Sequence, residues 1–298
     1  MKKWVVTIGN FDGVHLGHQE ILRVTRTQAQ RAGADWGVFT FRPHPQIALR
    51  PELQLKLLQT YDEKIQILKE MGVPRVIEQP FSREFSTTSS ERFFQDTLVK
   101  SLGATAIVVG YDFAFGKGRA GGLERLGELC AAAGVELTVV PALRLNGEAV
   151  SSSRIRRLLE AGDVETAAQL LGRCFYYQGV VIRGDSRGRK IGFPTLNLMP
   201  GEKLHLPNGV YATWTWINQK RYPSVTNIGV RPTFAKEGQP APVIIETHVL
   251  DASGDWYGEP VRTEAVKKLR DEKKFSGVDE LRTQIQKDID QARQILGA

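Results

Sequence analysis

Residues 4–18 read WVVTIGNFDGVHLGH. The apolar run 4–9 ends in glycine, and a short polar loop leads into an amphipathic stretch from Leu16, which predicts a strand, a tight loop and a helix start. His15 and His18 are three residues apart, so on a first helical turn they project the same way. Unpaired backbone N–H groups and the positive end of the helix dipole favour an anion there. The stretch therefore predicts a phosphate site after the first strand.

His15 and His18 also fit two other interpretations: half of a zinc site, or incidental residues at a helix start. A zinc site needs a third ligand, and the nearby candidates are His44 and Asp12. The glutamate that a zinc-protease motif carries between its histidines is missing. We therefore disfavour a metal, and we leave phosphate binding and an incidental role both open.

The first half of the chain alternates short apolar runs with amphipathic stretches. We predict strands at residues 4–9, 36–41, 75–81, 105–110 and 135–141, and helices at 16–31, 61–71, 91–102 and 122–133. Cap signals support two of the helix starts, with Thr60 paired to Glu63 and Thr88 paired to Glu91. This β-α order predicts a Rossmann-like domain with a parallel sheet, and such sheets bind ligands beyond the carboxyl ends of their strands.

The pattern changes near residue 172. Later runs are β-rich and separated by turn residues, which predicts an antiparallel barrel or sandwich. These runs are 176–183, 209–217, 222–228, 243–249 and 261–269. The last stretch, 278–296, places Leu281, Ile285 and Ile289 on one face and predicts a terminal amphipathic helix. The fold class is therefore α/β plus β, with one domain at 1–172 and another at 173–298.

Composition excludes several classes of protein. The chain has 298 residues and two cysteines, Cys130 and Cys174, which cannot make a disulfide framework or a four-ligand zinc site and suit the cytoplasm. Apolar runs are too short for a membrane helix, and polar residues interrupt the first one, so we expect no membrane span and no secretion signal. The net charge of +7 permits nucleic-acid binding but equally suits an enzyme of phosphorylated anions.

A second glycine-rich loop follows the first β-rich run and reads GDSRGRKIGFPTLN at 184–197. Its backbone N–H groups and cations suit phosphate, which predicts a phosphate flap. The phosphate-binding candidates of this flap are Gly184, Lys190 and Gly192. Pro194 fixes one φ angle and helps to aim Thr195 and Asn197, whose oxygens are hard ligands that suit Mg²⁺.

Four segments resemble the nucleotidylyltransferase superfamily and, more specifically, the bacterial bifunctional riboflavin kinase and FMN adenylyltransferase family, also called FAD synthetase. They are GNFDGVHLGH at 9–18, FRPHP at 41–45, VGYDFAFGK at 109–117 and SSSRIR at 151–156. The second half resembles the riboflavin kinase module, which implies a six-stranded antiparallel barrel. The matching segments are PTLN at 194–197, PNGVY at 207–211, NIGVRPTF at 227–234, ETH at 246–248 and LRDEKKF at 269–275.

The resemblance implies two reactions. ATP would phosphorylate riboflavin to FMN at the barrel, and AMP would pass from ATP to the terminal phosphate of FMN at the first domain, with release of pyrophosphate. It assigns Glu246 as general base on the ribityl 5′-hydroxyl. A lone carboxylate after the apolar run 243–245 fits that role, because a buried acid is costly without a purpose. Strand alternation leaves open that Glu246 faces solvent.

The resemblance also assigns residues to the first reaction. The candidates for holding ATP and its phosphates are Gly9, Phe11, His15, Gly17, His18 and Arg156. Arg156 lies in a serine-rich helix start, although an arginine followed by Arg157 is often a solvated surface cation. Asp112 and Phe113 resemble the flavin-side loop of the family, and the alternative is a turn that caps the next helix.

Mg²⁺ is the expected cofactor, with ATP as a substrate of both reactions. The expected partners are riboflavin, FMN, FAD and ATP, with no nucleic acid, membrane or obligate protein partner. A nucleotidylyltransferase with another acceptor would explain His15 and His18 but would leave the barrel unused. A flavin-responsive or RNA-binding regulator would predict lost catalytic positions or a basic aromatic face, and the sequence shows neither.

Overall fold

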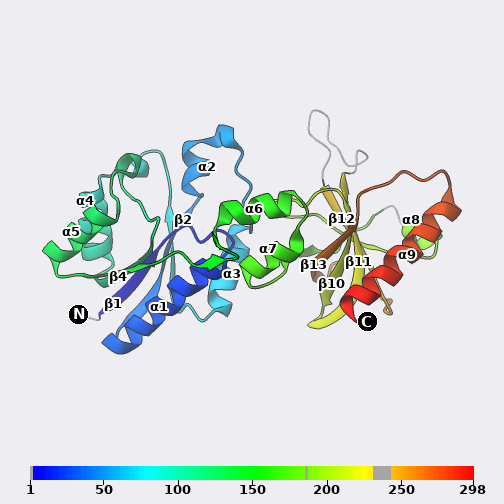
Figure 1. Ribbon diagram of the computed structural model, residues 1–298, viewed down its shortest axis with the longest axis horizontal. Helices are drawn as coiled ribbons and strands as arrows, with labels where there is room; N and C mark the ends of the chain where they lie inside the picture. Colours follow the sequence, from blue (N-terminus) through cyan, green and yellow to red (C-terminus); the bar gives the residue numbers. More distant parts are fainter. Residues whose placement is uncertain (1–2, 185–186, 231–242) are drawn as a thin grey trace. The chain divides into compact units, whose positions relative to one another are not determined.

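The computed structural model describes residues 3–184, 187–230 and 243–298. The chain divides into two compact units, the first ending at Ser152 and the second beginning at Ser153. Each unit has a main sheet of its own (Figure 1). Of the helices within the described ranges, none is long and apolar enough to cross a membrane.

The first unit is built on a parallel sheet with the strand order β3-β2-β1-β4-β5. Its strands are β1 (Trp4–Ile8), β2 (Asp35–Arg42), β3 (Val76–Pro80), β4 (Ala104–Gly110) and β5 (Glu136–Val140). This confirms the predicted Rossmann-like sheet. Along the chain, β2 and β3 are added on one side of β1, and β4 and β5 are added on the other side. The loops after the neighbouring strands β1 and β4 therefore start at the same edge of the sheet. Open sheets of this kind bind their ligands at such a point.

The helical segments of the first unit lie close to the predicted ranges. They are α1 (Leu16–Ala32), α2 (Pro45–Leu49), α3 (Tyr61–Glu70), α4 (Ser90–Arg92) and α5 (Leu123–Ala133), with 3-10 turns η1 (Pro51–Leu53), η2 (Phe85–Thr87) and η4 (Lys117–Arg119). A π-helix, η3 (Phe93–Ser101), continues α4, and a small hairpin pairs β6 (Arg144–Leu145) with β7 (Glu148–Ala149).

One of the two predicted helix caps is confirmed and the other is wrong. Thr60 and Glu63 form the capping box that opens α3. At α4 the cap is Ser89, whose side chain accepts a hydrogen bond from the Arg92 amide. The Thr88 backbone N–H donates to Phe85 O and closes the preceding turn, so it is not available to the Glu91 side chain for a capping box, and the helix begins one residue later than predicted.

Different helices cover the two faces of the parallel sheet. Along β1, Trp4, Val6 and Ile8 belong to a core cluster with side chains of η3 and α5, such as Phe94 and Leu126. The alternate residues of β1 are buried too, and α1 packs against β1, β2 and β4. Burial on both faces explains why these strands read as continuous apolar runs in the sequence.

The second unit contains an antiparallel sheet with the strand order β8-β13-β10-β11-β12-β9 within its described ranges. The strands are β8 (Phe175–Val180), β9 (Leu196–Leu198), β10 (Gly209–Ile217), β11 (Lys220–Val230), β12 (Val243–Val249) and β13 (Pro260–Arg270). The sheet curls into a half-barrel, and its edges approach where Ile182 N donates to Asn197 O at 2.8 Å. The sequence analysis missed β9, which is three residues long.

The second unit also contains short helices. α6 (Ser152–Glu160) begins at the last residue of the first unit, α7 (Val164–Leu171) packs against β8 and β13, and α8 (Arg187–Lys190) lies in the glycine-rich loop. The motif at 227–234 continues past Val230, and its residues 231–234 lie outside the described ranges.

One face of the curled sheet carries buried hydroxyl groups. Thr213 bonds to Ser224 and Thr226 at 2.7 Å, and further bonds of the same kind run between neighbouring strands. The other members of this network are Thr215, Thr247 and Thr263. Each hydroxyl has a partner, which offsets the cost of its removal from water.

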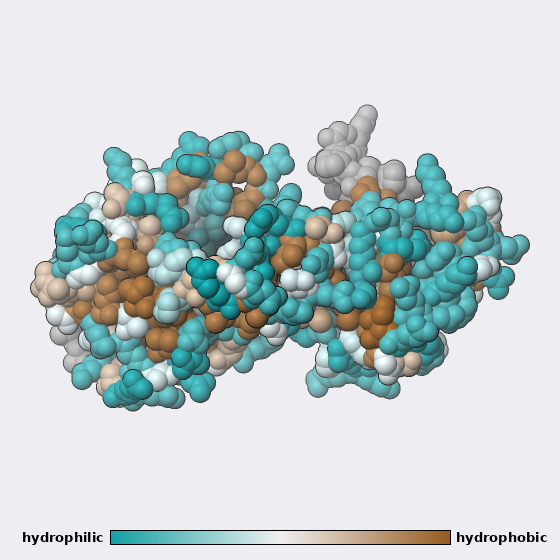
Figure 2. All heavy atoms as spheres, in the orientation of Figure 1, coloured by the Kyte–Doolittle hydropathy of each residue, from teal (hydrophilic) through white to brown (hydrophobic). Residues whose placement is uncertain are grey.

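The terminal helix α9 (Val278–Leu296) has the predicted bounds and covers the opposite face of the sheet. Ile289 and Ala292 pack there against Val210, Ala212 and Val225, while the outward face of the helix is hydrophilic (Figure 2). A buried ion pair reinforces this contact. Arg270 of β13 bonds to Asp288 at 2.7 Å through Nη2, and the Asp288 side chain is 4% exposed.

We expect Asp288→Asn to lower the free energy of unfolding of the second unit by about 3 kcal/mol, because the change leaves the Arg270 charge partly buried without its partner. Urea unfolding followed by circular dichroism measures the change. Asp290→Asn on the exposed side of α9 is the matched control and should differ from the wild type by less than about 0.5 kcal/mol. Equal midpoints for the two variants would contradict the expectation.

Candidate active sites

The loop after β1 follows a strained backbone path. Phe11, Gly13 and Val14 have φ angles of 51°, 86° and 36°. Glycine adopts such values at no steric cost, but Val14 is β-branched and rarely does so. Strain of this kind persists where the surroundings hold the chain, and it concentrates at functional sites. The geometry of the loop therefore supports the predicted location of a site.

Hydrogen bonds from distant segments hold the loop in place. Leu58 N donates to Asp12 Oδ1 at 2.9 Å, and Ser152 Oγ donates to Asp12 O at 2.8 Å. Gln59 Nε2 donates to Phe11 O at 2.8 Å. Asp12 is 5% exposed, so its carboxylate ties the loop to Leu58 in a setting where water competes little.

His15 is the N-cap residue of α1. Its Nδ1 accepts a hydrogen bond from His18 N at 3.3 Å, so the neutral ring carries its proton on Nε2. The two imidazoles stack with centroids 3.7 Å apart and planes 16° apart. A Cβ on Gly17 would lie 3.2 Å from the His15 ring, and a Cβ on Gly9 would lie 3.2 Å from the Phe11 ring. The structure thus brings these five predicted residues together.

Asp112 and Phe113 lie in the turn after β4, the strand beside β1. Asp112 is exposed, while Phe113 is half-buried and stacks on Phe115 at 5.5 Å. The next helical turn, η4, has Gly116 at its cap position and no side-chain cap bond, so the alternative of a helix-capping turn is wrong. A role of these residues towards flavin stays a prediction.

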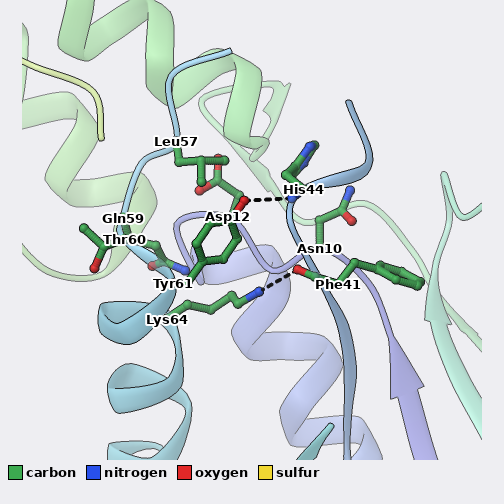
Figure 3. Close-up of a pocket in the computed structure, with 9 residues that line it drawn as sticks. All are labelled: Asn10, Asp12, Phe41, His44, Leu57, Gln59, Thr60, Tyr61 and Lys64. Carbon is green, nitrogen blue, oxygen red and sulfur yellow. Dashed lines mark hydrogen bonds between the residues drawn. The ribbon is translucent and has the colours of Figure 1, made fainter. Parts of the chain in front are cut away.

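A pocket opens beside the loop, at the carboxyl end of β2 and the start of α3 (Figure 3). It is lined by Asn10, Asp12, Phe41, His44, Leu57, Gln59, Thr60, Tyr61 and Lys64. His44 caps α2, because its ring Nδ1 accepts a hydrogen bond from Gln46 N at 3.1 Å. The backbone N–H of His44 donates to Tyr61 Oη at 2.8 Å. Both contacts fix the loop that follows β2.

In the second unit, the sheet register brings together residues that are far apart in sequence. Glu246 of β12 pairs with Asn197 of β9 on one side and with Asn227 of β11 on the other. Asn197 is 7% exposed, and Glu246 and Asn227 are half-buried. A Cβ on Gly184 would lie 2.5 Å from Asn197 Nδ2, so only glycine allows the loop to approach this amide. Three predicted residues, Gly184, Asn197 and Glu246, therefore cluster.

A histidine of β12 holds the segment that precedes β9 in place. His248 Nδ1 lies 2.7 Å from Pro194 O, and its ring packs edge-on against Phe193. Thr195 is half-buried and lies two residues before Asn197. Gly192 has a φ of 91° and is exposed. Lys190 ends α8, and its side chain is outside the described part of the structure.

Comparisons with known proteins match both units. The FAD synthetase family matches residues 1–154, and the Riboflavin kinase family matches residues 171–296. The chain belongs to the bifunctional riboflavin kinase/FMN adenylyltransferase family. A relative of that name from Bacillus subtilis is 37% identical over 293 residues, which cover 97% of this chain and 92% of the relative. One from Escherichia coli K12 is 35% identical over 294 residues, covering 98% and 93%.

A solved structure, described as a macrolide-efflux protein from Streptococcus pneumoniae, has the same fold. It superposes with a TM-score of 0.89 at 32% identity, covering 98% of this chain and 94% of that one. In this member of the bifunctional family, the loop with His15 and His18 lies in the segment matched by FAD synthetase. The cluster of Gly184, Asn197 and Glu246 lies in the segment matched by Riboflavin kinase.

The remaining predicted residue is Arg156, which lies on α6 in the second unit and is half-buried.

The sequence analysis missed two residues near the sites. Lys64 is buried, and its spacing from the buried Ile67 and Leu68 could have shown that it lies on the inner face of α3. Asn227 was part of a quoted motif, but its pairing with Glu246 depends on strand register.

The cap at His15 predicts a difference between two variants. Asparagine is a good N-cap residue and alanine is a poor one, so His15→Asn should be more stable to unfolding than His15→Ala by about 1 kcal/mol. Urea unfolding of the two proteins measures this difference. Both variants lose the imidazole, so the comparison isolates the cap. Equal stability would mean that the bond to His18 N contributes nothing.

Proposed function

We propose that this protein makes FAD from riboflavin in two ATP-dependent steps, one at each site. Riboflavin is phosphorylated to FMN beside Glu246, and FMN is adenylylated at the loop after β1. The observation that carries the proposal is that each of two separate clusters lies in the segment matched by one of the two families. A nucleotidylyltransferase with another acceptor would need only the first cluster.

In the proposed adenylyl transfer, a terminal phosphate oxygen of FMN attacks the α-phosphorus of ATP. A new P–O bond forms, the bond to the β-phosphate oxygen breaks, and pyrophosphate leaves. The reactants are anions, so alignment and charge stabilisation are the main tasks of the protein. Nε2–H of His15 can donate to phosphate because Nδ1 serves the cap. His18 and the positive end of α1 add to this donor set.

Other residues of the first reaction are assigned by the family resemblance. We propose that Gly9, Phe11 and Gly17 shape the loop around the nucleotide and that Arg156 binds its phosphates. Asp112 and Phe113 would contact the flavin. The position of their turn supports this assignment, since it follows β4 at the edge of the sheet where the loop after β1 also lies.

In the proposed kinase reaction, Glu246 takes the proton of the ribityl 5′-hydroxyl as its oxygen attacks the γ-phosphorus of ATP, and ADP leaves. Asn197 and Asn227 are the partners of Glu246 on the two neighbouring strands. We propose that Gly184, Lys190 and Gly192 contact the ATP phosphates from the flap. The close approach of Gly184 to Asn197 supports this assignment, because it brings the flap to the cluster.

We propose Mg²⁺ as the cation of the kinase site, held by Thr195 and Asn197. Their side-chain oxygens are hard, neutral ligands, and the phosphates of ATP supply the remaining ligands and the negative charge. The buried Asn197 amide, fixed against Gly184, fits such a group. When bound, the cation would neutralise charge on the transferring phosphoryl group.

We also propose that the catalytic domains divide near residue 172, with the adenylyltransferase at 1–172 and the kinase at 173–298. The start of the Riboflavin kinase match at residue 171 supports this boundary. Most of α6 and α7 lies between the two matched segments, since α6 begins at Ser152 and α7 ends at Leu171.

Incubation of the purified protein with riboflavin, ATP and Mg²⁺, followed by chromatography of the products, tests the function. The proposal requires FMN, FAD, ADP and pyrophosphate. Conversion of another acceptor without flavin products would support the other nucleotidylyltransferase, and flavin binding without turnover would support a regulator.

His18→Ala should slow the conversion of FMN to FAD by about 10²-fold, the scale for loss of one preorganised donor to transition-state charge. Riboflavin phosphorylation in the same preparation should hardly change, which controls for intact protein. Chromatographic rates of the two steps provide the measurement. Full FAD formation by the variant would reduce His18 to an incidental helix-start residue.

Glu246→Gln keeps the shape of the side chain but removes its basicity, so riboflavin phosphorylation should fall by about 10²- to 10⁴-fold. FMN supplied from outside should still become FAD at the normal rate. Glu202→Gln, at an exposed position of the same unit, is the matched control. An unchanged kinase rate in Glu246→Gln would place the base elsewhere.

A further inference from the structure

A buried lysine lies under the loop that carries His15 and His18. Lys64 of α3 is 4% exposed, and its Nζ donates to Thr40 Oγ1 at 3.1 Å and to Phe41 O at 3.3 Å. Figure 3 shows the bond to Phe41 O. Glu78 Oε1 is 3.6 Å away and balances its charge. Burial lowers the pKa of Lys64, while Glu78 and Asp12 oppose that shift. A cation is costly in such a place, so its contacts call for an explanation.

The contact with Thr40 fixes the direction of a second hydrogen bond. An ammonium group only donates, so Thr40 Oγ1 must accept from Lys64 and keeps its one proton for another partner. That partner is Asn10 O, at 3.2 Å. Thr40 is fully buried, so water cannot replace either bond. Lys64, Thr40 and Asn10 therefore form a directed chain from α3 to the loop.

Asn10 is where the loop leaves the sheet. Gly9 N donates to Phe39 O at 3.1 Å, and the Thr40 hydroxyl donates to the carbonyl oxygen of Asn10. Two successive residues, Gly9 and Asn10, are therefore anchored to β2. Phe11 follows with its φ of 51°. The position of the Asn10 carbonyl thus determines how the strained segment starts, and this segment ends at the helix with His15 and His18.

We propose that Lys64 is a positioning residue for adenylyl transfer, acting through Thr40 on the Asn10 carbonyl to hold the loop in its reactive shape. The proposal rests on the proposed function of the loop. Its effect belongs to the transition state, because small displacements of groups that stabilise developing charge lower the rate more than they weaken binding. Lys64 itself need not touch either substrate.

The test compares variants that break the chain with variants that keep it. Thr40→Val has nearly the same shape but no hydroxyl, and Thr40→Ser keeps the hydroxyl. Lys64→Met removes the ammonium and leaves Glu78 with Arg42, which is 3.8 Å away. Lys69→Met, at an exposed position of α3, is the matched control. The readouts are kcat and KM for FAD formation from FMN and ATP, measured beside riboflavin phosphorylation as the internal standard.

We expect Thr40→Val and Lys64→Met each to lower kcat by about 10-fold or more, with KM values within about 2-fold of the wild type. Thr40→Ser should retain most of the turnover. The double variant should be no slower than the slower single variant, because both changes break one chain. The kinase rate should not change in any of them.

Three results would overturn the proposal. Equal kcat for Thr40→Val and Thr40→Ser would show that the hydroxyl is unimportant, and this pair decides the question even if Lys64→Met does not fold. If the double variant lowered kcat by the product of the two single effects, Lys64 and Thr40 would act independently. A raised KM with unchanged kcat in Lys64→Met would make Lys64 a direct binder of an anionic substrate. Absence of FAD formation by the wild type would instead refute the proposed function.

Discussion

A polar group that leaves water has to find a partner inside the protein, and this constraint organises both units. In the first unit, the Asp12 carboxylate accepts a hydrogen bond from the Leu58 backbone N–H, and the Lys64 ammonium donates one to the Thr40 hydroxyl. Segments far apart in the sequence therefore meet at the loop after β1. Apolar burial supplies most of the stability of the sheet, but it is tolerant of small shifts in position. Directional bonds are less tolerant, and they determine the path of the loop.

Much of the fold could be predicted because its strongest signals are local. The central parallel strands β1, β2 and β4 are largely buried on both faces and lie next to glycine or proline, and α9 has a long amphipathic pattern. The failures also have physical causes. β9 has three residues, too few for a recognisable alternation, and the cap at Ser89 depends on the turn that ends at Thr88.

The candidate sites were predictable as loops but not as sets of contacts. Glycine-rich segments with His15 and His18, or with Thr195 and Asn197, have the composition of phosphate and cation sites. The pairing of Glu246 with Asn227 depends on strand register, which spans many residues and leaves no local signal. The polar residues of β10 and β11 point to a buried face rather than to solvent, so alternation alone could not decide which way Glu246 faces.

The hydroxyl-lined face of the second sheet affects how the stability of this unit responds to temperature. Unfolding exposes polar surface there, which lowers the heat capacity change, whereas exposure of apolar surface raises it. A sheet that buries Thr213, Ser224 and Thr226 in place of aliphatic side chains therefore unfolds with a smaller heat capacity change. Its stability curve is flatter, so both cooling and warming away from the optimum reduce the free energy of unfolding more slowly.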